Sequence, residues 1–191
     1  MVMNSYVIKK ASPSDVIEIK KLLVYVWTFT FQSILSPYTI KKVTSVCFDE
    51  GLLASQVIDK TIAFFVVRDE TDKIVGVANA REDENKVIIL NRLYVHPALH
   101  EYGIGKKLLD EIIKYFQGAE KILLEVLENN VDSIEFYLKY GFRITGTNIN
   151  IIDDVILHVK VMEKIVSSNK EKRVLDPTNE CTIKRLLGNK Y

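Results

Sequence analysis

The sequence predicts an α/β (α+β) protein in which helices cover both faces of a central, mostly antiparallel sheet. Residues 62–68, 74–80 and 87–95 are strand-like, and short polar turns separate them. Strands joined by such turns form an antiparallel meander. The third strand is apolar on both faces, as expected between two layers of helices. At 191 residues and 48% hydrophobic content, the chain is long enough to bury one good core.

The N-terminal part begins with a short strand at residues 6–9 and continues into helices. Ser12 is the expected N-cap of the first helix, and Pro13 occupies its first position. Apolar residues then recur at helical spacing, at Val16, Ile19, Leu22, Leu23 and Val26. Two further short helices are expected at residues 37–48 and 52–59.

An aromatic run follows the first helix, where Trp27, Phe29 and Phe31 alternate with threonines. These residues fit either a plug in the core or a wall of a substrate site. Core packing is the commoner use of such residues. Trp27 and Phe31 are nevertheless kept as candidate substrate-binding residues.

After the meander, a glycine turn opens an amphipathic helix. Its apolar stripe consists of Ile104, Leu108, Leu109, Ile112, Ile113 and Phe116. A strand at residues 122–127 and a short helix stopped by Gly141 come next. Residues 142–147 and 155–164 are expected to form a hairpin-like pair around a polar loop at residues 148–154.

Charge and cysteine content narrow the class of protein. Lys+Arg 26 balance Asp+Glu 25, which argues against nucleic-acid binding through bulk charge. Cys47 and Cys181 match neither a disulfide framework nor a metal-ligand spacing, so no metal is expected. No apolar run approaches the ~20 residues that span a bilayer, and a signal peptide's apolar segment is missing. We expect a cytoplasmic domain at residues 1–165, without membrane partners, and a polar extension of undetermined order at residues 166–191.

The turn that opens the amphipathic helix contains Gly103 and Gly105. Such a turn gathers unpaired backbone N–H groups, which is how proteins commonly hold phosphate. The Walker pattern fails because His100 stands where it needs a glycine, and no Ser or Thr follows Lys106. The dinucleotide fingerprint fails because Leu108 replaces its third glycine. Lys106 opposes the helix dipole, a cost that a bound anion would reverse.

Three blocks of the sequence, in order and suitably spaced, resemble the GNAT superfamily of N-acetyltransferases. They are Leu93, Tyr94, Val95, His96 and Pro97; then His100, Glu101, Tyr102, Gly103, Ile104 and Gly105; then Asn130, Ser133, Tyr137, Gly141 and Phe142. The resemblance covers about residues 6–164. Within the superfamily, the Asn-Arg-Leu-Tyr-Val segment and the aromatic run look like the PaiA-type polyamine (spermine/spermidine) acetyltransferases.

The resemblance implies the GNAT fold, with a splayed pair of parallel strands, and acetyl-CoA as the acetyl donor. The turn would hold the pyrophosphate through backbone N–H groups, and its residues are His100, Glu101, Tyr102, Gly103, Ile104, Gly105 and Lys106. The backbone of Leu93, Tyr94 and Val95 would pair with the pantetheine arm. The amide of Val95 would also polarise the thioester carbonyl. Asn130 and Ser133 would contact the far end of the arm.

Two further consequences of the resemblance concern single residues. Tyr137 would protonate the departing thiolate, although its spacing with Ile134 and Leu138 equally fits a packed core aromatic. His100 replaces the Gln or Arg of the family pattern. Because the turn acts mainly through backbone amides, we expect weaker cofactor affinity rather than lost function.

The sequence does not clearly indicate which residue acts as the general base. An amine with pKa ~10.4 needs a base or a water chain at neutral pH. Several polyamine-specific relatives carry a glutamate where this chain has Asn91, which cannot take a proton and is kept as a candidate substrate contact. Glu125, an acid within an apolar strand, is the candidate base, with a water chain as its rival. Alternatively, Arg92 pairs with Glu125 in a structural ion pair.

The sequence thus predicts an N-acetyltransferase that acts on a primary amine of a small molecule, with spermidine or spermine favoured. Scattered acids suit either a polycation or an ordinary solvated surface: Asp49, Glu50, Glu82, Asp83, Asp153 and Asp154. The alternatives are acetylation of a protein or a free amino acid, and a catalytically silent acyl-CoA-binding module. A homodimer is left open.

Overall fold

The computed structural model describes residues 6–166. The strands are β1 (Val7–Lys10), β2 (Ile62–Arg68), β3 (Ile74–Glu82), β4 (Val87–Val95), β5 (Lys121–Leu127), β6 (Arg143–Ile152) and β7 (Val155–Ile165). The helices are α1 (Val16–Phe31), α2 (Pro37–Cys47), α3 (Glu50–Ile58), α4 (Ile104–Tyr115) and α5 (Val131–Lys139), with short 3-10 turns η1 (Pro13–Asp15) and η2 (Pro97–Leu99). The predicted extension after residue 166 lies outside the described residues, and the domain boundary at residue 165 stays a prediction.

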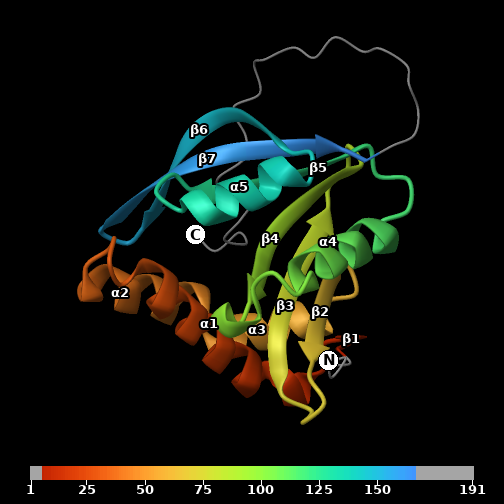
Figure 1. Cartoon of the computed structure of the whole chain (residues 1–191), viewed down its shortest axis with the longest axis horizontal. Coiled ribbons are helices and arrows are strands. Elements are labelled where there is room, and N and C mark those ends of the chain that lie inside the picture. The colour runs from red at the N-terminus through yellow and green to blue at the C-terminus, as the bar shows by residue number, and fades with distance from the viewer. Residues whose placement is uncertain (1–5, 167–191) are drawn as a thin grey trace.

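The strands form one seven-stranded sheet in the order β1-β2-β3-β4-β5-β7-β6. Every neighbouring pair is antiparallel except β4 and β5, which are parallel. This arrangement confirms the predicted mixed, mostly antiparallel sheet. Figure 1 shows the consequence for shape: β2, β3 and β4 share one axis, although neighbours among them are antiparallel. β5, β7 and β6 cross the top of the molecule at an angle to that axis.

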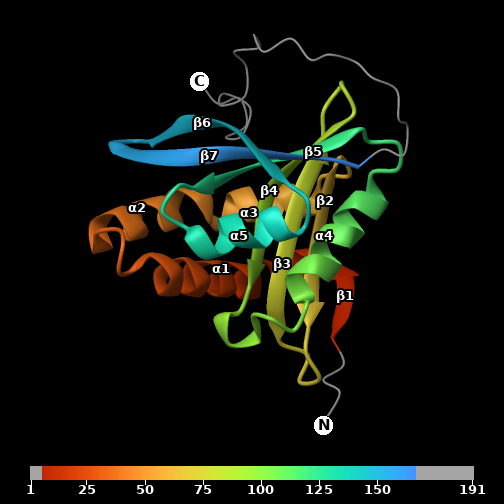
Figure 2. The same ribbon diagram turned by 45° about the horizontal axis from the view of Figure 1, so that its top comes forward.

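Two hydrophobic cores cover the two faces of the sheet. α4 and α5 pack on one face, where Leu108, Ile112 and Tyr137 join residues from the strands. The other face carries α1, α2 and α3, with Leu23 and Trp27 among the buried residues. Figure 2 shows these layers of helices on either side of the central strands. The prediction of a sheet between two helical layers is therefore confirmed.

The first helical turn begins as predicted, with Ser12 as N-cap and Pro13 after it, but this turn is the 3-10 turn η1, and α1 follows it at Val16. Ser12 precedes η1, and its backbone N–H donates to the Asp15 carboxylate at 2.8 Å. Arg68 on β2 donates to the same carboxylate at 2.6 Å, which ties the start of α1 to the sheet. Ser36 and Asp49 cap α2 and α3 by accepting backbone N–H groups.

The prediction of a polar loop at residues 148–154 is wrong. β6 continues through Ile152, and only Asp153 and Asp154 separate it from β7. Asn148 and Asn150 are polar, but they alternate with isoleucines, which is the two-residue period of a strand. A strand whose inner face is polar was therefore mistaken for a loop.

No helix among residues 6–166 is both long and apolar enough to cross a membrane. In the same residues, no group of three or more His, Cys, Asp or Glu side chains is placed to hold a metal ion.

Candidate functional site

The parallel strands β4 and β5 are paired only at their beginnings. The register runs from Val87 opposite Lys121 to Leu90 opposite Leu124, and no pairing follows it. Beyond Leu90, β4 continues along β3 while β5 turns across the molecule with β7 (Figure 1). The strands therefore splay, and one edge of the last part of β4 lacks a neighbouring strand.

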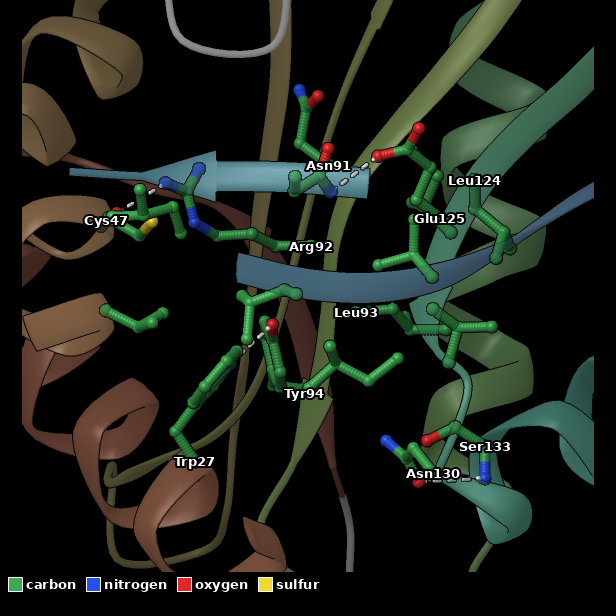
Figure 3. Close-up of a pocket in the computed structure, with 18 of the residues that line it drawn as sticks. Trp27, Cys47, Asn91, Arg92, Leu93, Tyr94, Leu124, Glu125, Asn130 and Ser133 are labelled. Atoms are coloured by element: carbon green, nitrogen blue, oxygen red, sulfur yellow. Dashed lines mark hydrogen bonds between the residues drawn. The ribbon is translucent and has the colours of Figure 1, made fainter. Parts of the chain in front are cut away.

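A pocket of about 290 Å³ lies where these strands part (Figure 3). Its walls come from α1, α2, α3 and α5 and from β4, β5, β6 and β7. Most of the predicted site residues meet here: Trp27, Phe31, Asn91, Leu93, Tyr94, Glu125, Asn130, Ser133 and Tyr137. Val95 and the turn at residues 100–106 are not among the lining residues, so the predicted pyrophosphate-binding turn lies apart from this pocket.

A β-bulge marks the point of separation on β4. Ala80 of β3 opposes Leu90 and Asn79 opposes Arg92, so Asn91 has no partner on β3. A bulge of this kind bends its strand and increases the local twist. Asn91 Nδ2 donates to Asn79 Oδ1 at 3.0 Å. Asn91 Oδ1 and Asn79 Nδ2 are buried and have no hydrogen-bond partner within residues 6–166.

The free edge of β4 presents backbone groups to the opening. The N–H of His96 donates to Val75 on β3 at 2.8 Å. Because successive residues direct their backbone groups to opposite sides of a strand, Leu93 and Val95 direct theirs toward the opening. The His100 ring folds back on this edge, with its Nε2 at 3.1 Å from the Val95 carbonyl oxygen. His100, which departs from the family pattern, thus holds the end of β4 in place through this contact.

The turn before α4 has the geometry of an anion site built from backbone. Gly103 is the N-cap and has φ +74°, a conformation that favours glycine. The first bond of α4 runs from the Lys107 N–H to the Gly103 carbonyl at 3.1 Å. The amides of Ile104, Gly105 and Lys106 precede this bond and have no partner inside the helix.

The side chains of this turn are mostly directed to solvent. Glu101, Tyr102 and Lys106 are exposed, and Ile104 is buried beneath them. The Lys106 ammonium pairs with Asp110 at 2.5 Å, and this partner raises the pKa of Lys106. Any binding at the turn therefore depends on its backbone more than on these side chains.

Gly105 is the point where α4 touches α5. A Cβ at this position would lie 3.1 Å from the ring of Phe136, closer than ordinary contacts allow. The Phe136 ring in turn packs edge-on against Tyr137, with centroids 5.2 Å apart. One packed contact therefore links the backbone turn to the helix that carries Tyr137.

Tyr137 lies on the inner side of α5 and is buried, with 8% of its surface exposed. Its ring packs against Phe142 with centroids 5.3 Å apart, and no described residue hydrogen-bonds its hydroxyl. Burial, followed by the nearby Tyr94, raises the pKa of Tyr137. The hydroxyl is therefore protonated at neutral pH. The same burial disfavours any other anion placed beside it, including a thiolate.

Asn130 and Ser133 stand together at the start of α5 (Figure 3). Asn130 is the N-cap, and its Oδ1 accepts the Ser133 N–H at 3.3 Å. Both residues line the pocket, and their contact with the pantetheine arm stays a prediction. Asn130 also has a structural role, which spacing alone did not indicate.

Two residues of the aromatic run pack in the core, whereas Phe29 is 52% exposed and does not line the pocket. Trp27 and Phe31 are only 7% and 4% exposed, and their rings pack with centroids 4.6 Å apart. Both also line the pocket. The Trp27 indole donates to the Tyr94 hydroxyl at 2.9 Å. They are core residues with one surface on the pocket.

Glu125 of β5 lines the pocket, with both carboxylate oxygens held by amides. Asn148 donates to Oε1 at 2.9 Å, and Asn150 donates to Oε2 at 2.8 Å. Both asparagines come from the segment expected to be a loop. The alternating Asn and Ile residues were the sequence signal that could have found them.

The expected ion pair between Arg92 and Glu125 is wrong. Arg92 instead donates to Gln56 Oε1 at 2.7 Å and to the Cys47 carbonyl at 2.8 Å. In Figure 3, its side chain runs from β4 toward Cys47, whereas Glu125 extends from β5 on the other side. The sequence did not indicate this position, because it depends on how the β4 bulge meets α2 and α3.

The scattered acids serve local contacts outside the pocket. Asp153 pairs with Lys42 at 2.8 Å, and Asp154 accepts the Tyr38 hydroxyl at 2.8 Å. The other members cap a helix, pair with lysines or close a turn: Asp49, Glu50, Glu82 and Asp83. Among the lining residues, Glu125 is the only carboxylate.

A splayed parallel pair in a mixed sheet and a backbone turn at a helix start define the GNAT class of fold. The model of the acetyltransferase (GNAT) family matches residues 28–142, more than half of the chain. The chain belongs to this family.

Two curated relatives from Bacillus subtilis resemble parts of the chain. It is 35% identical over 71 residues to the protein YqkA of Bacillus subtilis, covering 37% of this chain and 20% of YqkA. It is 28% identical over 68 residues to the spermine/spermidine N(1)-acetyltransferase of the same organism, covering 34% of this chain and 45% of that enzyme. The chain thus spans less than half the length of these curated relatives.

A solved structure supports the fold over a larger share of the chain. The PaiA N-acetyltransferase of Thermoplasma acidophilum, solved in complex with coenzyme A, aligns with a TM-score of 0.76. The alignment covers 85% of this chain and 99% of that one, at 23% identity. At this identity the likeness shows the fold.

Proposed function

We propose that this chain transfers an acetyl group from acetyl-CoA to a primary amine of a small molecule. The observation that carries the proposal is the separation of β4 from β5, which leaves a free backbone edge beside a pocket. The family and the coenzyme A bound to the PaiA structure support the choice of donor.

The residues present fit acetyl-CoA in two places. The free amides of Ile104, Gly105 and Lys106 suit a pyrophosphate at a helix N-terminus. The edge that includes Leu93 and Val95 suits the amide groups of a pantetheine arm, which would bind as an added strand. These contacts use backbone, so the exposed side chains of the turn do not decide the fit.

The chemistry follows from groups around the pocket. The amine nitrogen attacks the carbonyl carbon, a C–N bond forms and the C–S bond breaks. The Val95 N–H, directed into the opening, stabilises charge on the carbonyl oxygen, a contribution commonly worth about 3 kcal/mol. Glu125 accepts the proton lost by the amine, and Tyr137 gives its proton to the departing sulfur. The pKa of Tyr137 is raised by burial, and the same surroundings raise the basicity of the thiolate that receives the proton.

Among primary amines, a polyamine such as spermidine or spermine is the acceptor that similarity supports. The matched Bacillus subtilis enzyme is a spermine/spermidine acetyltransferase, and the carboxylate of Glu125 suits an ammonium group. Acetylation of a protein amine or a free amino acid is the alternative acceptor class.

Release of free thiol from acetyl-CoA tests the proposal directly. The purified chain is assayed with spermidine, spermine, free amino acids and peptides with a lysine or a free N-terminus. Thiol release that depends on one of these amines is the expected result. Binding of acetyl-CoA without release for any amine would instead indicate a catalytically silent acyl-CoA-binding module.

A further inference from the structure

The pocket between β4 and β5 contains one charge of each sign. Among its lining residues, Arg92 and Glu125 are the only ones with charged side chains. They extend from opposite sides of the opening (Figure 3). A polyamine carries several positive charges and would meet one carboxylate and one guanidinium. The lining is better matched to a molecule that carries an ammonium and an anionic group.

Arg92 is a buried cation without an anionic partner. It is 8% exposed, and no carboxylate among residues 6–166 lies within 4.0 Å of its guanidinium. Its hydrogen-bond partners are the neutral oxygens of Gln56 and Cys47, and the Phe48 ring lies 5.9 Å away. Desolvation lowers the pKa of Arg92, which reflects the cost of this charge. Buried charges are ordinarily paired, so an unpaired one beside a pocket indicates a site for a ligand.

A purely structural role accounts for only part of this arrangement. Arg92 does connect β4 to the end of α2 through Cys47, and to α3 through Gln56. Two neutral acceptors, however, need only two neutral donors. A guanidinium offers five N–H groups in a planar fork, and that fork matches a carboxylate in bidentate geometry. The unused donors and the uncompensated charge remain unexplained by the structural role.

We infer that Arg92 is an anion subsite of the acceptor pocket and that the acetylated amine belongs to a molecule that also carries a carboxylate. The ammonium of such an amino acid lies toward Glu125, and its carboxylate lies toward Arg92. The inference rests on the proposed function and narrows its acceptor class. A polyamine without a carboxylate leaves the Arg92 charge unpaired.

Matched pairs of acceptors test the inference in the unaltered protein. Each amino acid is compared with its decarboxylated amine, for example lysine with cadaverine and ornithine with putrescine, and spermidine and spermine complete the panel. The best acceptor is expected to carry a carboxylate, and its kcat/KM is expected to fall at least about tenfold when that group is removed. A best acceptor without a carboxylate overturns the inference but leaves the proposed transfer to amines intact. No thiol release with any amine overturns the proposed function itself.

The variant Arg92→Gln separates recognition of the anion from structural support. It is expected to lower kcat/KM for the amino acid far more than for its decarboxylated amine, and so to abolish the preference within each matched pair. Arg92→Lys, which keeps the charge, is expected to restore part of the preference. If Arg92→Gln lowers kcat/KM equally for both members of a pair, the preference is retained. That result would show that Arg92 has a structural role only. Thermal unfolding of each variant shows whether the fold survives, and the pairs in unaltered protein decide the matter if it does not.

Discussion

The two sides of the β4–β5 opening are built in different ways. The side toward α4 and α5 consists of backbone groups and of three side chains from α5 and its cap, those of Asn130, Ser133 and Tyr137. All of them lie between Leu93 and Tyr137. The side toward α1–α3 and β6–β7 consists of side chains from segments that span most of the chain. The proposed donor side is therefore local in sequence, whereas the proposed acceptor side is assembled by tertiary structure.

This difference indicates how each side responds to substitution. Backbone amides at a glycine turn are insensitive to most substitutions, so the donor side can stay constant while its sequence varies. A pocket made of single side chains such as Arg92, Glu125 and Asn150 changes its ligand with each substitution. Variants on the two sides are accordingly expected to separate donor binding from acceptor binding.

The largest effect on turnover is expected at Tyr137, which lies between the two sides. Tyr137→Phe removes the hydroxyl that protonates the leaving sulfur, and turnover is expected to fall at least about tenfold. Binding of acetyl-CoA, measured by calorimetry, is expected to survive because the ring remains. Tyr140→Phe, at the C-cap of the same helix, is the matched control, as Tyr140 does not line the pocket. An unchanged rate would remove Tyr137 as the acid.

The next largest effect on turnover is expected at Glu125, on the acceptor side. Glu125→Gln keeps the shape but cannot accept a proton, so kcat is expected to fall about tenfold. The Kd of acetyl-CoA is expected to stay unchanged. Glu135→Gln, at an exposed position on α5, serves as the control. Full activity of Glu125→Gln would assign proton removal to a water chain.

A smaller effect is expected on the donor side at Gly105. In Gly105→Ala the new Cβ meets the Phe136 ring, and the turn is expected to shift to relieve this contact. A shift that weakens the backbone contacts of the turn by about 1 kcal/mol lowers acetyl-CoA affinity about fivefold. Gly146→Ala is the control, because no atom lies within 4 Å of a Cβ there. Equal acetyl-CoA affinity in both variants would mean that the contact of Gly105 with Phe136 does not support donor binding.

The smallest effect is expected where an amide supports Glu125. Asn150→Ala removes one of its two hydrogen bonds, and the KM of the amine is expected to rise about threefold. The KM of acetyl-CoA serves as the internal control and is expected to stay constant. A change confined to acetyl-CoA would contradict the division between the two sides.

The sequence could describe the proposed donor side because the physical signal there is local. Gly103, Gly105 and Tyr137 have fixed spacing along consecutive elements, so a motif describes them. The acceptor side was described poorly. Asn148 and Asn150 were assigned to a loop because polar residues on the inner face of a strand look like loop residues. The contacts of Arg92 depend on a bulge and on helices about 40 residues earlier in the chain, which no local pattern encodes.

The close approach of Gly105 to Phe136 has a consequence for the order of events. A ligand that fixes the α4 turn also restricts α5, because no spare volume separates the glycine from the ring. Asn130, Ser133 and Tyr137 belong to α5 or its cap, and all three line the acceptor pocket. We therefore expect that pocket to take its final form after the donor has bound. The two substrates would then add in a fixed sequence, with acetyl-CoA first and free coenzyme A leaving last.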